Sequence, residues 1–225
     1  MAASTAPEPE GTVAAPTLRG AMNAVVAFAA ALVSLRLAAE LLRRARSRAA
    51  PELVAWAVSL SAYAIAAAAL AAGAAGGWHN GTFRVYYLFG GLLTAPLFGV
   101  GSLLRMRLRW AAPAGLIYAG VAVGVAIAAP LTRAVHGSGI PHAQDHLDVF
   151  PARVLAIAGN SVGTLAVVGV ALITFRRRPL GNGLILCGIA CAALGSGLSG
   201  LGEASTASLL AVAAALLYAG VASPR

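Results

Sequence analysis

Lysine is absent from this sequence, and charged residues of every kind are scarce. All sixteen Lys-plus-Arg positions are arginine, and charged residues make up 10% of the 225 positions, whereas an ordinary soluble domain carries roughly 25%. The lack of lysine excludes a retinal-binding seven-helix protein, because its Schiff base forms on a lysine amine. The low charge, with 60% hydrophobic residues and a mean hydropathy of +0.83, excludes an ordinary soluble domain as well.

Motifs that carry chemistry are also few. The two cysteines, Cys187 and Cys191, lie in an apolar run with three residues between them, so they do not form the CxxC motif of thiol oxidoreductases. No P-loop and no Pro-Gln pair of the PQ-loop transporters occurs. No Asp or Glu falls clearly at the centre of an apolar stretch, which disfavours a proton pump built on a central carboxylate. An enzyme is therefore the least expected class.

What the sequence does contain is seven apolar stretches, each near the ~20 residues that a transmembrane helix needs. They cover residues 20–42, 53–76, 84–104, 112–131, 153–175, 183–202 and 205–222. They predict an all-α, polytopic membrane helix bundle with seven transmembrane helices in one domain, 20–222. Residues 1–19 lack the positive region of a signal peptide, and we expect them to form a disordered tail outside the cytoplasm. The last two stretches could instead form one long broken hairpin.

Arginines cluster after the first, third and fifth stretches and are few in the other turns. The clusters are Arg43, Arg44, Arg46 and Arg48, then Arg105, Arg107 and Arg109, then Arg176, Arg177 and Arg178. Because cytoplasmic loops are enriched in basic residues, the alternation predicts an N-terminus outside and a C-terminus inside. The clusters also account for much of the net charge of +9. Anionic membrane lipids are therefore the expected partners, and nucleic acid is not.

The most distinctive part of the sequence is the start of the third apolar stretch. An arginine followed by two tyrosines at a membrane boundary favours binding of a lipid phosphate or an anionic ligand, or else acts only as an interface anchor. With two polar side chains of the fifth stretch it predicts a pocket between helices. The pocket residues are Arg84, Tyr86, Tyr87, Asn160 and Thr164. Pro96 predicts a hinge, since an interior proline removes a helix hydrogen bond. The first functional hypothesis is thus a small transporter or ligand-binding membrane protein of unknown substrate.

The outer loop between the fourth and fifth stretches holds three of the four histidines. If this loop were helical, His142 and His146 would share one face, a geometry suited to zinc or copper. The candidate metal ligands are His136, His142, Asp145 and His146. The alternatives are a solvated loop and a pH sensor. A metal-binding sensor or enzyme that uses the 136–148 loop is the third functional hypothesis, and no other cofactor is expected.

Arg36 and Glu40 lie four residues apart near the inner end of the first stretch. This spacing predicts an ion pair on one helix face, which serves as a gate or only neutralises an arginine that reaches the lipid headgroups.

Small residues recur at four-residue spacing, as in Gly120 with Gly124 and Gly159 with Gly163. Such stripes let helix backbones approach closely, within the bundle or against another membrane protein or a second copy. The second functional hypothesis is therefore a non-catalytic subunit or assembly partner of a membrane complex.

Three segments together suggest a source. They are the stretch from Arg84 to Ser102, the span from Asn160 to Thr164, and Gly181-Asn182-Gly183 after an arginine cluster. In these segments the chain resembles uncharacterised multi-span membrane proteins of GC-rich actinobacteria. The arginine-only, alanine-rich composition also indicates such a genome. The resemblance implies a location in the bacterial cytoplasmic membrane as a multi-pass protein, and it implies no known activity.

Overall fold

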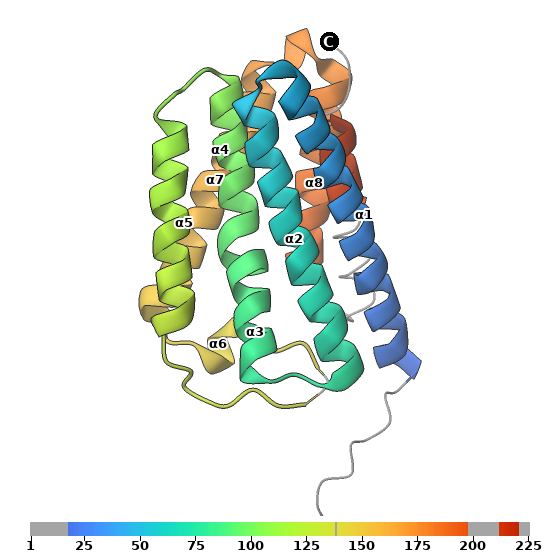
Figure 1. Cartoon of the computed structure of the whole chain (residues 1–225), viewed down its shortest axis with the longest axis vertical. Coiled ribbons are helices and arrows are strands. Elements are labelled where there is room, and N and C mark those ends of the chain that lie inside the picture. Colours follow the sequence, from blue (N-terminus) through green and yellow to red (C-terminus); the bar gives the residue numbers. More distant parts are fainter. Residues whose placement is uncertain (1–17, 138, 198–211, 221–225) are drawn as a thin grey trace, which may run out of the picture.

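A computed structural model describes residues 18–137, 139–197 and 212–220, and these residues form a bundle of long helices (Figure 1). Helix α1 spans Leu18–Arg48 and α2 spans Pro51–Gly76. The third crossing consists of α3 (Asn80–Tyr86), the π-helical segment η1 (Tyr87–Leu93) and α4 (Thr94–Arg105). The second half comprises α5 (Ala111–Ala128), α6 (Ala143–His146), the π-helical turn η2 (Val149–Arg153), α7 (Val154–Ile173), the 3₁₀ turn η3 (Phe175–Arg177) and α8 (Pro179–Gly197), with a further helix over 212–220.

Five of these helical crossings are long and apolar enough to span a membrane. They run over Ala24–Ser47, Pro51–Gly76, Asn80–Arg105, Ala111–Ala128 and Val149–Ile173. They match the first five predicted spans to within a few residues and confirm an all-helical protein with several candidate membrane spans. The apolar helix Pro179–Cys191 is shorter. The boundary between the sixth and seventh predicted spans falls in 198–211, and most of the predicted tail falls in 1–17, both outside the described residues.

The three arginine-rich turns lie at the same end of the bundle. The turns between α1 and α2, between α4 and α5, and between α7 and α8 are all at the top of Figure 1, and the loop between α5 and α7 is at the bottom. The described helices thus alternate in direction as the arginine pattern predicts.

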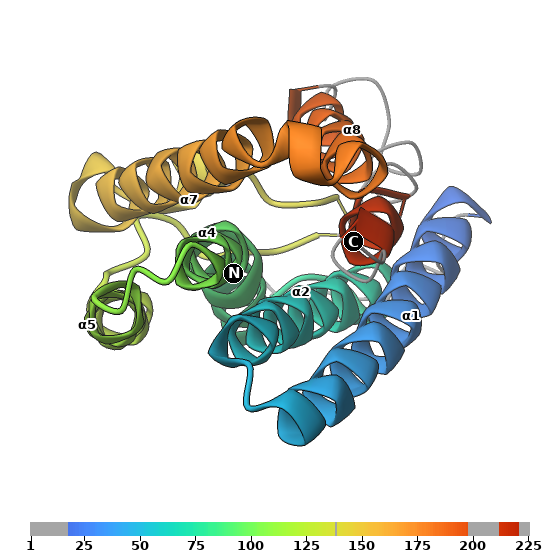
Figure 2. The same ribbon diagram turned by 90° about the horizontal axis from the view of Figure 1, so that it is seen from above.

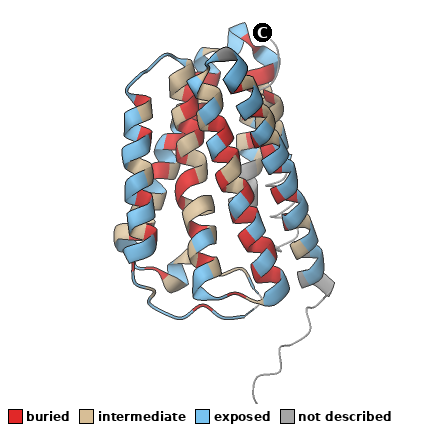
Figure 3. Cartoon of the chain, viewed as in Figure 1, coloured by how far each residue is buried: buried red, intermediate tan, exposed pale blue. Residues whose placement is uncertain are grey.

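Helices α2 and α4 lie at the centre of the bundle, and α5 lies at its rim (Figure 2). Buried residues concentrate on α2 and α4, whereas α1 and α5 are largely exposed (Figure 3). Buried residues make up 56% of an apolar 18-residue segment of α2 but 22% of the corresponding segment of α5. Alanine and leucine dominate the buried set, with Trp56, Phe83 and Leu92 among its largest side chains. The face that α5 leaves exposed is apolar, as a lipid-facing helix requires.

Helices α4 and α7 touch through their backbones at a pair of glycines. A Cβ atom built on Gly163 would lie 2.5 Å from the carbonyl oxygen of Ala95, and one built on Gly99 would lie 2.7 Å from the Gly163 Cα. No real side chain fits at such distances. Gly163 belongs to a predicted small-residue stripe, and the structure uses that position for close helix packing.

The outer loop lies across the bottom of the bundle and is fixed to the turn between α2 and α3. The Trp78 N–H donates to the Gly137 carbonyl at 2.7 Å, and the Val135 N–H donates to Asn80 Oδ1 at 2.9 Å. Leu131 and Leu147 form an isolated antiparallel bridge at the ends of the loop.

Candidate functional site

The middle of the third crossing is irregular. Segment η1 has π-helical bonding, in which N–H groups reach back five residues, and α4 returns to the four-residue spacing. Pro96 lies just after this change and has no N–H. An N–H at position 96 would bond to the Gly91 carbonyl in the π register or to the Leu92 carbonyl in the α register. The proline therefore removes the donor that one of these two carbonyls would otherwise have.

Side chains from two neighbouring helices donate to these two carbonyls. Asn160 of α7 donates through Nδ2 to the Gly91 carbonyl oxygen at 2.8 Å. Tyr118 of α5 donates through its hydroxyl to the Leu92 carbonyl oxygen at 2.9 Å. Because a bilayer core has no water to satisfy a free carbonyl, these two bonds stabilise the irregular backbone.

Two more hydroxyl bonds link the beginning of α4 to η1 and to α2. Thr94 donates through Oγ1 to the Phe89 carbonyl at 2.7 Å, within the same crossing. Ser59 of α2 donates through Oγ to the Thr94 carbonyl at 2.6 Å. Helices α2, α5 and α7 thus each contribute one hydroxyl or amide donor to the backbone between Gly91 and Thr94. We call this set of three bonds the α4 clamp: Ser59 to Thr94, Tyr118 to Leu92, and Asn160 to Gly91.

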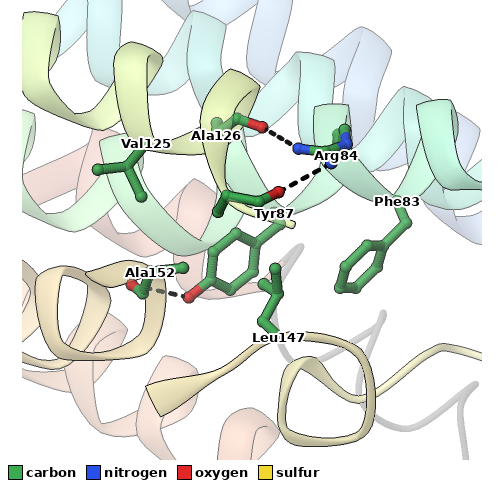
Figure 4. A pocket seen from close by; sticks show the side chains of 8 residues that line it. Phe83, Arg84, Tyr87, Val125, Ala126, Leu147 and Ala152 are labelled. Atoms are coloured by element: carbon green, nitrogen blue, oxygen red, sulfur yellow. Dashed lines mark hydrogen bonds between the residues drawn. The ribbon is translucent and has the colours of Figure 1, made fainter. Parts of the chain in front are cut away.

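Arg84 and Tyr87 also bond to backbone carbonyls (Figure 4). The Arg84 guanidinium donates to the carbonyls of Ala126 at 2.5 Å, Ala129 at 2.8 Å and Ile127 at 3.2 Å, so it caps the carboxyl end of α5. Carbonyls at a helix C-terminus lack intrahelical donors and carry partial negative charge, which favours a cation there.

The two predicted tyrosines have different surroundings. The Tyr87 hydroxyl donates to the Ala152 carbonyl at 3.1 Å. Tyr86 packs edge-on against Trp78, with ring centroids 5.4 Å apart. Both rings are held by other helices and turns of the bundle, as expected of large aromatic side chains in a packed interior.

A small apolar cavity lies between Arg84 and Tyr87. Its volume is about 10 Å³, roughly the space of one water molecule. Its lining comprises Phe83, Arg84, Tyr87, Val125, Ala126, Ala129, Leu147 and Ala152. The structure therefore brings Arg84 and Tyr87 together. Asn160 and the half-buried Thr164 lie elsewhere, on α7.

The predicted metal ligands are distributed along the outer loop. His146 bonds through Nδ1 to the Arg133 carbonyl at 3.2 Å, and its ring lies against Phe83 at a centroid distance of 5.5 Å. His142 precedes the four-residue helix α6, which contains Asp145 and ends at His146; His136 lies upstream. Among the described residues, no group of three or more His, Cys, Asp or Glu side chains is close enough together to hold a metal ion. The zinc or copper site stays a prediction.

Glu40 pairs with arginines that follow it rather than with Arg36. Its carboxylate accepts from Arg44 Nε at 2.8 Å and also contacts Arg43. The expectation of an Arg36–Glu40 pair is corrected accordingly. The physical reason is orientation, because an acidic residue four positions before a basic one makes the stronger helical pair, and Arg36 with Glu40 has the opposite order.

Sequence reasoning missed a second cavity, at the arginine-rich end of the bundle. It also has a volume of about 10 Å³ and lies between α2, α4, α7 and α8. Its polar lining includes Arg178 and Asn182, which are 8% and 3% exposed. The one signal in the sequence is Pro179, which begins α8 directly after the cluster, so that Arg178 is at the start of a helix and not in an open loop.

Comparisons with known protein families, with curated proteins and with solved structures found no match.

Proposed function

We propose that the protein is a small membrane transporter in which the third crossing is the moving element. The observation that supports this function is the α4 clamp. It joins an irregular, proline-containing helix to three neighbours through side-chain bonds at about the middle of the Asn80–Arg105 crossing.

The clamp permits movement of the third crossing because each of its hydrogen bonds is weak enough to break and to be replaced by another. Hydrogen bonds between membrane helices contribute ~0.6 kcal/mol on average, so two arrangements of the clamp can differ little in free energy. Local π-helical segments occur frequently at functional sites. Interrupted helices near the membrane midplane line the substrate paths of many transporters. In this proposal Asn160 holds the hinge in one state and contacts the transported solute in another.

The proposal includes seven spans, with the N-terminus outside and the arginine-rich end in the cytoplasm. The joint position of the three arginine turns at one end of the bundle supports this orientation. Location in a bacterial cytoplasmic membrane is part of the same proposal.

Cysteine labelling in proteoliposomes tests the motion without knowledge of the substrate. Leu92 is fully buried beside the clamp, and Leu92→Cys would be placed in a Cys187→Ala, Cys191→Ala background. A transporter exposes this position to water from each side in turn, so a membrane-impermeant maleimide added outside or inside should label it. The control Val121→Cys, on the exposed apolar face of α5, should remain unlabelled. No labelling of Leu92→Cys from either side would contradict the proposal.

A second function, a subunit or assembly partner of a membrane complex, is supported by the outer face of α5. A Cβ atom built on Gly120 or Gly124 meets nothing within 4 Å, and both glycines are exposed. Their spacing is that of a helix-dimerisation stripe. This function predicts a defined complex in mild detergent that the double variant Gly120→Leu, Gly124→Leu dissociates and Gly169→Leu on α7 does not. A bare monomer in native mass spectrometry would contradict it.

A further inference from the structure

Arg36 lies on the outer face of α1, directly opposite the face that this helix buries. Helix α1 packs against α2 and lies at the rim of the bundle (Figure 2). At 3.6 residues per turn, a residue two positions away is about 200° around the helix. Arg36 is two positions from both Ser34 and Ala38, which are 1% and 3% exposed. Its side chain therefore leaves the helix on the side away from the bundle.

The surface around Arg36 is apolar. Leu32, Val33 and Leu35 are 53%, 48% and 55% exposed, and most of α1 is exposed in Figure 3. Arg36 is inside the candidate membrane span Ala24–Ser47. It precedes Arg43, the first arginine of the cluster, by seven positions, which is about 10 Å along the helix.

A guanidinium at this depth needs a polar partner. Charged side chains within a bilayer are costly unless they are paired or reach the headgroups. The long apolar stem of an arginine lies along hydrophobic surface while its charged end extends toward the membrane boundary. The partner of Arg36 must therefore lie outside the bundle, on the side of the arginine-rich end.

The carboxylate nearest to Arg36 in the sequence of α1 is already engaged. Glu40, one helical turn further on, accepts from Arg44 at 2.8 Å and also contacts Arg43. Within the part of the chain that the structure describes, the Arg36 side chain forms no ion pair. Three arginines thus share one carboxylate, and this end of α1 carries an excess of positive charge.

We propose that Arg36 binds the phosphate of an anionic phospholipid in the leaflet at the arginine-rich end, with the lipid's acyl chains along Leu32 and Val33. The five N–H donors of a guanidinium form a fork that matches phosphate oxygens. The excess positive charge from Arg43 and Arg44 favours an anionic headgroup over a zwitterionic one. The site is separate from the α4 clamp, so it stands whether or not the third crossing moves.

Charge complementarity favours a lipid over a second copy of the chain on this face. The described residues of α1 offer a second copy one carboxylate, that of Glu40, which is held by Arg43 and Arg44. The exposed leucines and valine beside Arg36 need no polar partner and suit acyl chains.

Native mass spectrometry of the full chain, titrated with phosphatidylglycerol or phosphatidylcholine, tests the site. The variant Arg36→Gln changes an exposed residue, so the fold should be kept. The matched control is Arg46→Gln, an exposed arginine of the same helix beyond the apolar segment, which loses the same charge. Arg36→Gln should weaken phosphatidylglycerol binding about tenfold or more, and Arg46→Gln should bind as the wild type does. Arg36→Lys, which keeps the charge and loses the fork, should have an intermediate affinity.

Four results would overturn the proposal. The first is equal phosphatidylglycerol affinity of the wild type and Arg36→Gln. The second is an equal loss in Arg36→Gln and Arg46→Gln, because the lipid would then respond only to net charge. The third is equal affinity of the wild type for the two lipids. The fourth is a co-purified polypeptide that Arg36→Gln releases, because the partner of Arg36 would then be a protein.

Discussion

Asn160 and Pro96 should be energetically coupled, although they lie on different helices. Asn160→Ala removes the donor to the Gly91 carbonyl, and position 96 has no N–H that could replace it in the π-helical register. The net contribution of a hydrogen bond to stability is ~0.5–1.5 kcal/mol, and an unsatisfied buried polar group costs about 1–3 kcal/mol. Hydrogen bonds between membrane helices, measured by double-mutant cycles, contribute ~0.6 kcal/mol on average. We therefore expect Asn160→Ala to cost about 1 kcal/mol of unfolding free energy.

Pro96→Ala restores the missing N–H, so the cost of Asn160→Ala should fall substantially in that background. The loss of packing around the half-buried asparagine is common to both backgrounds and cancels in the double-mutant cycle. Unfolding in mixed dodecylmaltoside and SDS micelles, followed by circular dichroism, measures the four free energies. Thr164→Ala, one turn further along α7, is the matched control and should show no coupling to Pro96→Ala. Equal costs of Asn160→Ala in the two backgrounds would refute our account of the clamp.

Three further results follow from the packing, the cap and the outer loop. Gly163→Ala should destabilise the protein by about 1–3 kcal/mol through overpacking, measured in the same micelle assay. Gly169→Ala, with nothing within 4 Å of its Cβ, should be neutral or stabilising. Equal effects of the two substitutions would show that the close approach of α4 and α7 is unimportant for stability. Arg84→Gln weakens the cap of α5 and should lower the unfolding free energy by about 1.5–3 kcal/mol, the value of hydrogen bonds to a charged group. The thermal midpoint should fall, and an unchanged melting curve would contradict the cap. If the histidine loop binds zinc, His142→Ala with His146→Ala should weaken zinc affinity in isothermal titration calorimetry, and unchanged affinity would exclude the site.

The five candidate membrane-spanning helices could be predicted from sequence because hydropathy alone decides which segments can leave water. The third is an example, expected over 84–104 and observed as Asn80–Arg105. Pro96, the predicted hinge, lies in the first turn of α4, directly after the irregular segment η1. The π-helical register before it was not predictable, because its stability depends on donors from three other helices and not on local propensity.

The candidate site was less predictable than the helices. A polar side chain in an apolar helix either contacts a ligand or satisfies a backbone carbonyl, and the two roles look the same in sequence. Asn160 in an apolar run predicts a ligand contact, yet its amide bonds to a carbonyl 69 positions earlier in the chain. Arg84 at a boundary predicts an anion site, yet it caps the end of α5. Which carbonyls lack donors becomes apparent only when the helices are assembled. Apart from Pro179, nothing in the sequence distinguishes Arg178 from its neighbours in the arginine cluster, because the burial of one arginine in a cluster leaves no periodic pattern.

Helix α5 has a consequence for the lipid around the protein. It has 18 residues, whereas α2 has 26, so at 1.5 Å per residue their lengths are about 27 Å and 39 Å. A hydrocarbon core of ~30 Å is matched by α5 upright, but α2 must tilt or extend into the headgroups. Helix α5 lies at one rim of the bundle, and α1, whose candidate span Ala24–Ser47 has 24 residues, lies at the opposite rim (Figure 2). A surrounding bilayer therefore meets a short apolar wall at α5 and a long one at α1. The protein therefore imposes a thickness gradient on its surroundings, and bilayers with short acyl chains will fit the α5 side best.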